Sequence, residues 1–165
     1  MIKLIVLDVD GTLTDGKIIY DDNGIESKNF DVKDGLAVAT WTKKLDRKAA
    51  IITGRKSKLV EKRAAELGIS HLYQGVHNKL EVLEAICKGE GIRLSEVAAI
   101  GDDLNDLKML NGVGISFAPA NAVEYILNEV KVVCSKNGGD GAVREMIETI
   151  CKNDDIFEDF IDVWR

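Results

Sequence analysis

The sequence has no long apolar run. Near its beginning, only four apolar residues separate Lys3 from Asp8. A bilayer-spanning helix needs roughly 18 such residues, and the core of a signal peptide needs roughly 7–15. We therefore expect a cytoplasmic protein that makes no membrane contact.

Paired cysteines and basic clusters are also missing. Cys87, Cys134 and Cys151 are odd in number and widely spaced, and none belongs to a C-x-x-C pair, which argues against a disulfide framework and a zinc knuckle. We expect them to be buried apolar residues. The formal net charge is −6, and basic residues form only short runs such as Lys43-Lys44, which argues against nucleic acid as a partner.

The chain has the length and the apolar content of one domain, and its apolar residues recur periodically. Its 165 residues, 45% of them hydrophobic, can bury roughly 70% of the unfolded surface. Apolar runs bounded by turn residues predict strands at 2–8, 48–53, 71–74, 97–101, 113–117 and 131–134. Helical periodicity predicts helices at 34–45, 57–67, 78–89, 103–110, 121–128 and 141–151. This alternation predicts an α/β fold: a three-layer, Rossmann-like parallel sheet with helices on both faces.

Two segments depart from the alternation. After the first strand, IIY and IESKNF flank the turn-forming DDNG, which predicts a β-hairpin inserted at about 14–32. The hairpin either projects over the end of the first strand or forms a surface or subunit contact. The second segment is a C-terminal tail, residues 153–165, following a single domain over 1–152.

The tail has the pattern of an amphipathic helix. If it is helical, Ile156, Phe160 and Trp164 share one face, and most of its acidic residues point elsewhere. We expect this face to dock on the protein itself or on its own oligomer rather than on a foreign partner.

Polar residues follow several of the predicted strands. In open parallel sheets ligands bind outside the carboxyl ends of the strands, so these residues would meet at one edge. Alone, each has an ordinary explanation as a turn residue, a helix cap or a surface charge. It is their joint placement that indicates catalysis. The residues are Asp8, Asp10, Thr53, Asp102, Asp103 and Asp106, together with Lys79 at the start of the helix after the third strand.

Clustered carboxylates need a cation or a proton between them. Two carboxylates about 4 Å apart repel by roughly 4 kcal/mol at an effective dielectric constant of 20, and Asp102 adds to this repulsion. Since no histidine or cysteine lies nearby in sequence, the oxygen donors favour Mg²⁺ over zinc.

Such a site suits phosphoryl transfer. An aspartate can attack phosphorus and form an aspartyl-phosphate, which divides one difficult step into two easier ones. Mg²⁺, Lys79 and the Thr53 hydroxyl would offset the repulsion between this nucleophile and the phosphate. Asp10 is placed to protonate the leaving oxygen and later to deprotonate water.

Four motifs follow one another along the chain: DVDGT at 8–12, ITGR at 52–55, Lys79 and GDDLND at 101–106. In this order they resemble the motifs of the haloacid dehalogenase superfamily of aspartate-nucleophile phosphatases. The short distances between these motifs are similar to those of the branch without a cap domain. The resemblance implies that Asp8 is the nucleophile and Asp10 the acid and base. It also implies that Mg²⁺ is held by the Asp8 side chain, the Asp10 carbonyl and Asp102, with Asp103 and Asp106 supporting metal-bound water and the loop.

Within that branch the chain is similar to phosphatases of eight-carbon sugar acid phosphates, which serve lipopolysaccharide precursor synthesis. The similarity covers FDVKDG at 30–35, residues 53–63, LYQGVHNK at 72–79 and GGDGAVRE at 138–145. It implies a homotetramer in which the hairpins of neighbours join and an adjoining subunit partly closes each site. It also implies a small anionic sugar acid phosphate as substrate, bound by Asp10, Lys33, Asp34, Gly35, Arg55, Arg63 and Lys79.

Three other interpretations stay open. Phosphatases of nine-carbon, sialic acid-type substrates are close relatives, but a glutamate can stand at the position of Arg55 in them, so the TGR sequence favours the eight-carbon acid. A receiver-like phospho-acceptor module has similar residues in a different order. A non-catalytic scaffold would be expected to have lost a catalytic position, and none is replaced here.

Overall fold

A six-stranded parallel sheet forms the centre of the computed structural model, which describes residues 1–165. Its strand order is β5-β4-β1-β6-β7-β8. The strands are β1 (Leu4–Leu7), β4 (Lys48–Ile52), β5 (His71–Tyr73), β6 (Val97–Ile100), β7 (Ile115–Ala118) and β8 (Val132–Val133). Leu7 pairs with Ile51 on one side and with Ile100 on the other, so β1, β4 and β6 end side by side.

Strand β1 is fully buried because both of its faces are covered. Ile5 and Leu7 belong to one hydrophobic cluster and Leu4 and Val6 to the other, as the alternation of side chains along a strand requires. The predicted three-layer α/β fold is confirmed.

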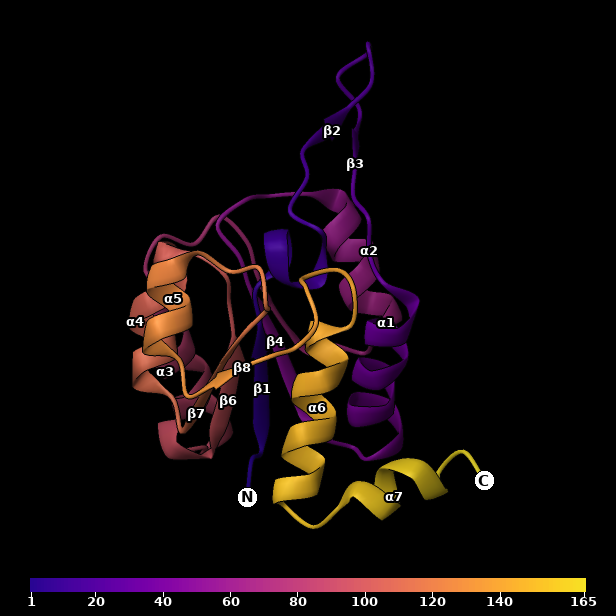
Figure 1. Ribbon diagram of the computed structural model, residues 1–165, viewed down its shortest axis with the longest axis vertical. Helices are drawn as coiled ribbons and strands as arrows, with labels where there is room; N and C mark the ends of the chain where they lie inside the picture. The colour runs from indigo at the N-terminus through magenta and orange to yellow at the C-terminus, as the bar shows by residue number, and fades with distance from the viewer.

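Three helices cover each face of the sheet (Figure 1). One face carries α1 (Val32–Ala39), α2 (Lys58–Glu66) and α6 (Ala142–Asn153). The other carries α3 (Lys79–Glu90), α4 (Leu107–Gly112) and α5 (Glu124–Glu129). None of these helices, nor the short one in the tail, combines the length and the hydropathy that crossing a bilayer requires.

Several predicted boundaries differ from the structure. Helix α1 begins at Val32 rather than 34 because the Asp31 side chain accepts hydrogen bonds from the Lys33 and Asp34 amides, both at 2.9 Å. It gives way at Thr40 to a wider turn over 40–44. The predicted helix at 103–110 opens with a tight turn over Leu104–Asp106, and the one at 121–128 begins only at Glu124. Strand β7 begins at Ile115 rather than 113, since the Gly114 amide donates to the Leu94 carbonyl instead of the sheet.

The inserted hairpin is present. Its strands β2 (Ile19–Tyr20) and β3 (Glu26–Ser27) pair antiparallel, and the Asp21 side chain accepts hydrogen bonds from the Asn23 and Ile25 amides in the turn. The hairpin projects beyond the carboxyl ends of the sheet strands (Figure 1).

The tail lies at the opposite end of the molecule, near the N-terminus (Figure 1). Its helix α7 (Phe157–Asp162) buries Phe160 in the cluster on the α1–α6 face, and Ile156 packs against that cluster. Trp164 donates a hydrogen bond to the Thr40 hydroxyl at 3.1 Å but remains 54% exposed. The tail therefore docks on its own chain. The three cysteines are buried and unpaired, as predicted.

Candidate active site

Most of the predicted strand-end residues line one cavity, while Lys79 and Asp106 are buried beside Asp8 and do not line it. It has a volume of about 190 Å³ and opens at the carboxyl ends of β1, β4 and β6. Its lining residues are Asp8, Asp10, Thr53, Gly54, Arg55, Asp102, Asp103 and Asn105. Asp8 and Thr53 are buried at its floor, while Asp103 is exposed and caps the turn that follows it.

A tight turn over Val9–Leu13 holds the two aspartates of the first motif. Gly11 has a φ of +88°, a conformation that L residues rarely adopt, and a Cβ there would overlap the Asp102 carboxylate. The Thr14 hydroxyl accepts hydrogen bonds from the Gly11 and Gly16 amides at 3.2 and 3.1 Å. The turn therefore fixes where Asp8 and Asp10 emerge from the sheet.

The GGDG stretch braces this turn from behind. A Cβ on Gly138 would overlap the Gly11 carbonyl, and the Gly139 amide donates to the Thr12 carbonyl at 3.0 Å. Only residues without side chains allow this close approach of two backbones.

Lys79 lies between two buried carboxylates. Its ammonium donates to Asp8 Oδ1 at 2.7 Å and to Asp106 Oδ1 at 2.5 Å, and its side chain is 1% exposed. Burial lowers the pKa of Lys79, but attraction to Asp8 and Asp106 outweighs burial, and the pKa is raised. Lys79 therefore stays charged beside Asp8.

The Asp106 carboxylate accepts hydrogen bonds from Lys79 and from the loop that carries Asp102. While Oδ1 accepts from Lys79, Oδ2 accepts from the amides of Asp102 and Asp103 at 3.0 and 3.3 Å. With both oxygens occupied, Asp106 fixes the position of Lys79 and the shape of the Asp102 loop.

The donor set fits a hard divalent cation. Carboxylate oxygens of Asp8, Asp102 and Asp106 lie within 4.8 Å of one another. Burial, followed by repulsion from Asp106, raises the pKa of Asp8 well above its usual range, although Lys79 opposes this shift. Burial also raises the pKa of Asp102 to about 6, again with repulsion from Asp106. With both Asp106 oxygens engaged, Asp8 and Asp102 are the carboxylates of this group that could hold Mg²⁺.

Arg55 presents a free donor at the rim of the cavity. Its Nη2 contacts Glu26 Oε1 and the Tyr20 hydroxyl, both at 3.1 Å, while its Nη1 is buried without a hydrogen-bond partner. An anionic group in the cavity could satisfy that donor.

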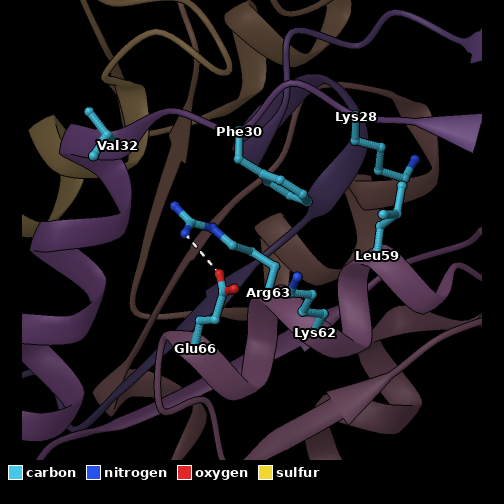
Figure 2. Close-up of a pocket in the computed structure, with 7 residues that line it drawn as sticks. All are labelled: Lys28, Phe30, Val32, Leu59, Lys62, Arg63 and Glu66. Atoms are coloured by element: carbon cyan, nitrogen blue, oxygen red, sulfur yellow. Dashed lines mark hydrogen bonds and ion pairs between the residues drawn. The ribbon is translucent and has the colours of Figure 1, made fainter.

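The other predicted substrate residues do not line this cavity. Arg63 borders a separate cavity of about 330 Å³ under the hairpin, where it pairs with Glu66 and stacks over Phe30 (Figure 2). Gly35 lies against the Arg63 guanidinium, and Lys33 is exposed at a third cavity. Asp34 is buried and accepts the Arg144 amide at the start of α6, and burial raises its pKa to about 6.

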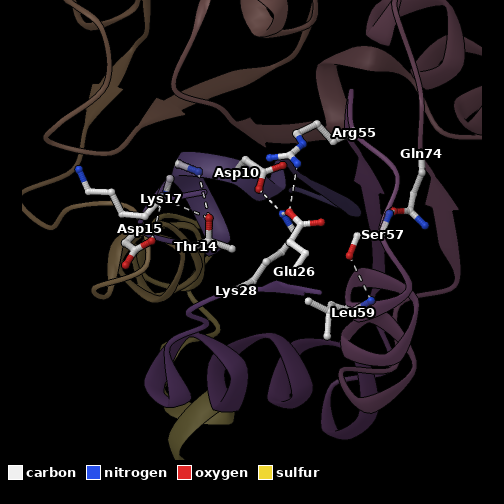
Figure 3. Close-up of polar contacts among 12 residues, drawn as sticks. Asp10, Thr14, Asp15, Lys17, Glu26, Lys28, Arg55, Ser57, Leu59 and Gln74 are labelled. Carbon is white, nitrogen blue, oxygen red and sulfur yellow. Dashed lines mark hydrogen bonds and ion pairs between the residues drawn. The ribbon is translucent and has the colours of Figure 1, made fainter. Parts of the chain in front are cut away.

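The sequence left open whether the hairpin projects over the site, and neither Glu26 nor Lys28 was among the predicted site residues. Lys28 pairs with Asp10, and Glu26 pairs with both Lys28 and Arg55 (Figure 3). The available signal was the spacing of Glu26 and Lys28, because residues i and i+2 of an extended segment lie on one face.

Known proteins are similar to this chain in sequence and in fold. A family model of haloacid dehalogenase-like hydrolases matches residues 71–147. The chain is 44% identical to the 3-deoxy-D-manno-octulosonate 8-phosphate phosphatase KdsC of Escherichia coli strain K12, over 90% of this chain and 79% of that protein. The chain belongs to the haloacid dehalogenase-like hydrolases.

Solved structures of this hydrolase family agree with the fold. The 3-deoxy-D-manno-octulosonate 8-phosphate phosphatase of Moraxella catarrhalis, in complex with magnesium, phosphate and KDO, has a TM-score of 0.95 and 45% identity, over 99% of this chain and 94% of that one. The cobalt-bound deoxy-D-mannose-octulosonate 8-phosphate phosphatase of Haemophilus influenzae has a TM-score of 0.86 and 40% identity, over 92% and 88%.

Proposed function

We propose that the protein is a Mg²⁺-dependent phosphatase that hydrolyses 3-deoxy-D-manno-octulosonate 8-phosphate to the free sugar acid and phosphate, in lipopolysaccharide precursor synthesis. The observation that carries this proposal is the similarity over nearly the whole chain to the Moraxella catarrhalis structure with magnesium, phosphate and KDO. The cavity at the strand ends supports it, since it combines clustered carboxylates, Thr53 and Arg55.

The proposed metal site uses the side chains of Asp8 and Asp102 and the Asp10 carbonyl. Asp103 and Asp106 support it through the loop they cap and brace. Bound there, Mg²⁺ supplies the positive charge that lets an anionic nucleophile approach an anionic phosphate.

The proposed reaction has two steps. In the first, an Asp8 oxygen attacks phosphorus, the bond from phosphorus to the sugar oxygen breaks, and Asp10 gives that oxygen its proton. In the second, water attacks the aspartyl-phosphate, Asp10 takes a proton from it, and phosphate leaves with Asp8 regenerated. Lys79 holds Asp8 through Oδ1, and Thr53 and Lys79 offset charge on the phosphoryl group.

The proposed sugar acid contacts differ in their support. Arg55 lines the cavity and has a buried donor without a partner. Lys33, Gly35 and Arg63 lie outside the cavity, so their proposed contact requires the sugar acid to extend beyond it toward the hairpin and α1. For Asp34, the buried contact with α6 supports a structural role instead.

We also propose a homotetramer assembled through the hairpins. The exposed side chains of Ile18, Tyr20 and Ile25 support self-association there. The division into a catalytic domain over 1–152 and a tail over 153–165 is likewise a proposal, as is the cytoplasmic location.

A panel of phosphorylated sugar acids tests the proposed substrate. We expect the highest kcat/KM, with Mg²⁺, for 3-deoxy-D-manno-octulosonate 8-phosphate. A clear preference for a nine-carbon, sialic acid-type phosphate would overturn the proposed substrate but leave the proposed phosphatase activity in place. No turnover of any phosphate ester by the Mg²⁺-loaded protein would overturn the enzyme itself.

A further inference from the structure

A buried lysine of the hairpin reaches into the active site of its own chain. Lys28 follows β3, and its side chain is only 2% exposed. Its Nζ donates to Asp10 Oδ1 at 2.5 Å and lies 3.1 Å from Glu26 Oε1 (Figure 3). The same Glu26 oxygen contacts Arg55 Nη2 at 3.1 Å. Asp10, Lys28, Glu26 and Arg55 therefore form one continuous chain of charges.

The burial of this ammonium separates it from ordinary surface pairs. An exposed lysine that pairs with a carboxylate contributes little and samples many rotamers. A lysine withdrawn from water must keep its partners, because an unpaired buried charge is costly. The Lys28 ammonium is therefore held between Asp10 and Glu26.

Asp10 depends on this contact for its orientation. The hydrogen bond from Lys28 is the only one that its side chain accepts in the structure. The base of the hairpin is anchored to the same region, because Thr14 and Phe30 form a β-bridge and the Thr14 hydroxyl holds the turn that contains Gly11. The segment carrying Lys28 is therefore fixed relative to Asp10.

We propose that Lys28 is a positioning residue that holds the Asp10 carboxylate toward the cavity, and that Glu26 joins this pair to Arg55. The proposal rests on the proposed function, in which Asp10 donates and accepts the reaction's proton. Proton transfer requires a heavy-atom distance of roughly 2.6–3.2 Å, so a carboxylate free to rotate spends less time in reach of the leaving oxygen. The hairpin is thereby part of the catalytic apparatus of its own subunit.

The kinetic test compares Lys28→Met with Lys17→Met, a matched control on the same inserted segment whose side chain is exposed and forms no ion pair. We expect Lys28→Met to lower kcat by about 10- to 100-fold, a part of the 10²- to 10⁴-fold that general acid–base catalysis contributes. KM should change less than about twofold, and Lys17→Met should behave as the wild type. An unchanged kcat in Lys28→Met would overturn the proposal.

A second comparison separates positioning from a general structural effect. In an Asp10→Asn background, Lys28→Met should lower the residual kcat no further, because the group that it positions is already disabled. An equal fold-loss of kcat in the wild-type and Asp10→Asn backgrounds would overturn the claim that Lys28 acts through Asp10.

Crystallography gives a readout that needs no activity. In Lys28→Met the Asp10 side chain should leave the position it has in the wild type, while the Val9–Leu13 turn stays in place. An unmoved Asp10 would overturn the proposal even if the variant were slow. If the wild type hydrolysed no phosphate ester, the proposed function would fail, and this comparison would still decide whether Lys28 positions Asp10.

Discussion

The two ends of the central sheet bury different kinds of side chain. At the carboxyl ends of the strands, Asp8, Lys79 and Asp106 are buried together, and the pKa of Asp8 is raised well above its usual range. At the amino ends, the tail buries Phe160 and packs Ile156 against the apolar cluster. One end holds charge out of water, and the other removes apolar surface from it.

The carboxyl ends of the strands are therefore where function is supported at the expense of stability. Buried charges contribute little net stability even when paired, and a catalytic arrangement retains them for their chemistry. Burial of an aromatic side chain contributes a few kcal/mol to the free energy of unfolding. This contribution does not depend on how a substrate is positioned. Changes at the charged end should therefore affect activity first, and changes at the apolar end should affect stability alone.

The sharpest test of this contrast is Asp8→Asn. We expect phosphate release to fall on the order of 10⁴-fold or more, because the nucleophile is lost. Without Mg²⁺, the Tm should stay equal to the wild type or rise, since a neutral amide replaces a carboxyl group that burial disfavours as an anion. Initial rates and thermal unfolding of the same preparation measure both. Substantial Mg²⁺-dependent turnover would remove Asp8 from its proposed role.

Lys79→Met should damage both properties. It leaves Asp8 and Asp106 facing each other without a cation, which should lower the free energy of unfolding by about 3–5 kcal/mol and abolish detectable activity. Lys108→Met, which changes an exposed lysine on the adjoining helix α4, is the control and should alter neither. Urea unfolding at neutral pH gives the comparison, and a fully stable Lys79→Met variant would contradict it.

At the apolar end, Phe160→Ala should separate stability from activity. The side chain is 2% exposed, so its loss should lower the free energy of unfolding by about 3 kcal/mol. The kcat/KM of the folded enzyme should remain unchanged because the tail lies at the end of the molecule opposite the hairpin (Figure 1), while residues that follow the carboxyl ends of the strands line the cavity. Val163→Ala, at an exposed site after the same helix, serves as the control. A fall in kcat/KM would indicate that the tail takes part in closing a site.

The smallest expected effect concerns Asp34, a residue of α1 that contacts the start of α6 and lies outside the catalytic cavity. Burial raises its pKa to about 6, so the folded state binds this proton more tightly than the unfolded state does. Its contribution to stability is therefore largest below about pH 4 and is lost as the pH rises through about 6, by about 3 kcal/mol. Asp34→Asn should lack this decline. Denaturant titrations between pH 4 and 7 measure it, and identical pH profiles would contradict the assignment.

The fold and the floor of the cavity could be predicted from sequence because both follow simple periodic rules. Apolar strands alternate with amphipathic helices, and polar residues at the ends of parallel strands must meet at one edge. Asp8, Thr53 and Asp102 obey this rule and line one cavity. Lys79 was found because the first residue of a helix after a strand lies at the same edge.

What could not be predicted depends on contacts between segments that no periodic pattern links. Lys28 meets Asp10 across a turn and a hairpin, and Arg63 turns toward Glu66 and Phe30 rather than toward the cavity. Asp34 was assigned to the substrate by resemblance, yet it accepts an amide of α6, a helix more than a hundred residues away. The orientations of these side chains depend on contacts between distant segments, and these contacts form only when the chain folds.

The most direct test of the catalytic account is the detection of a phosphoryl group on Asp8. With p-nitrophenyl phosphate, whose leaving group needs no proton, the Asp10→Asn variant should form the aspartyl-phosphate and hydrolyse it slowly, so a rapid acid quench in the presence of Mg²⁺ should trap it. We predict a gain in mass of one phosphoryl group on the peptide that contains Asp8, absent when Asp8→Asn is added. A phosphoryl group on another residue, or phosphate release with no modified peptide at any quench time, would contradict the account.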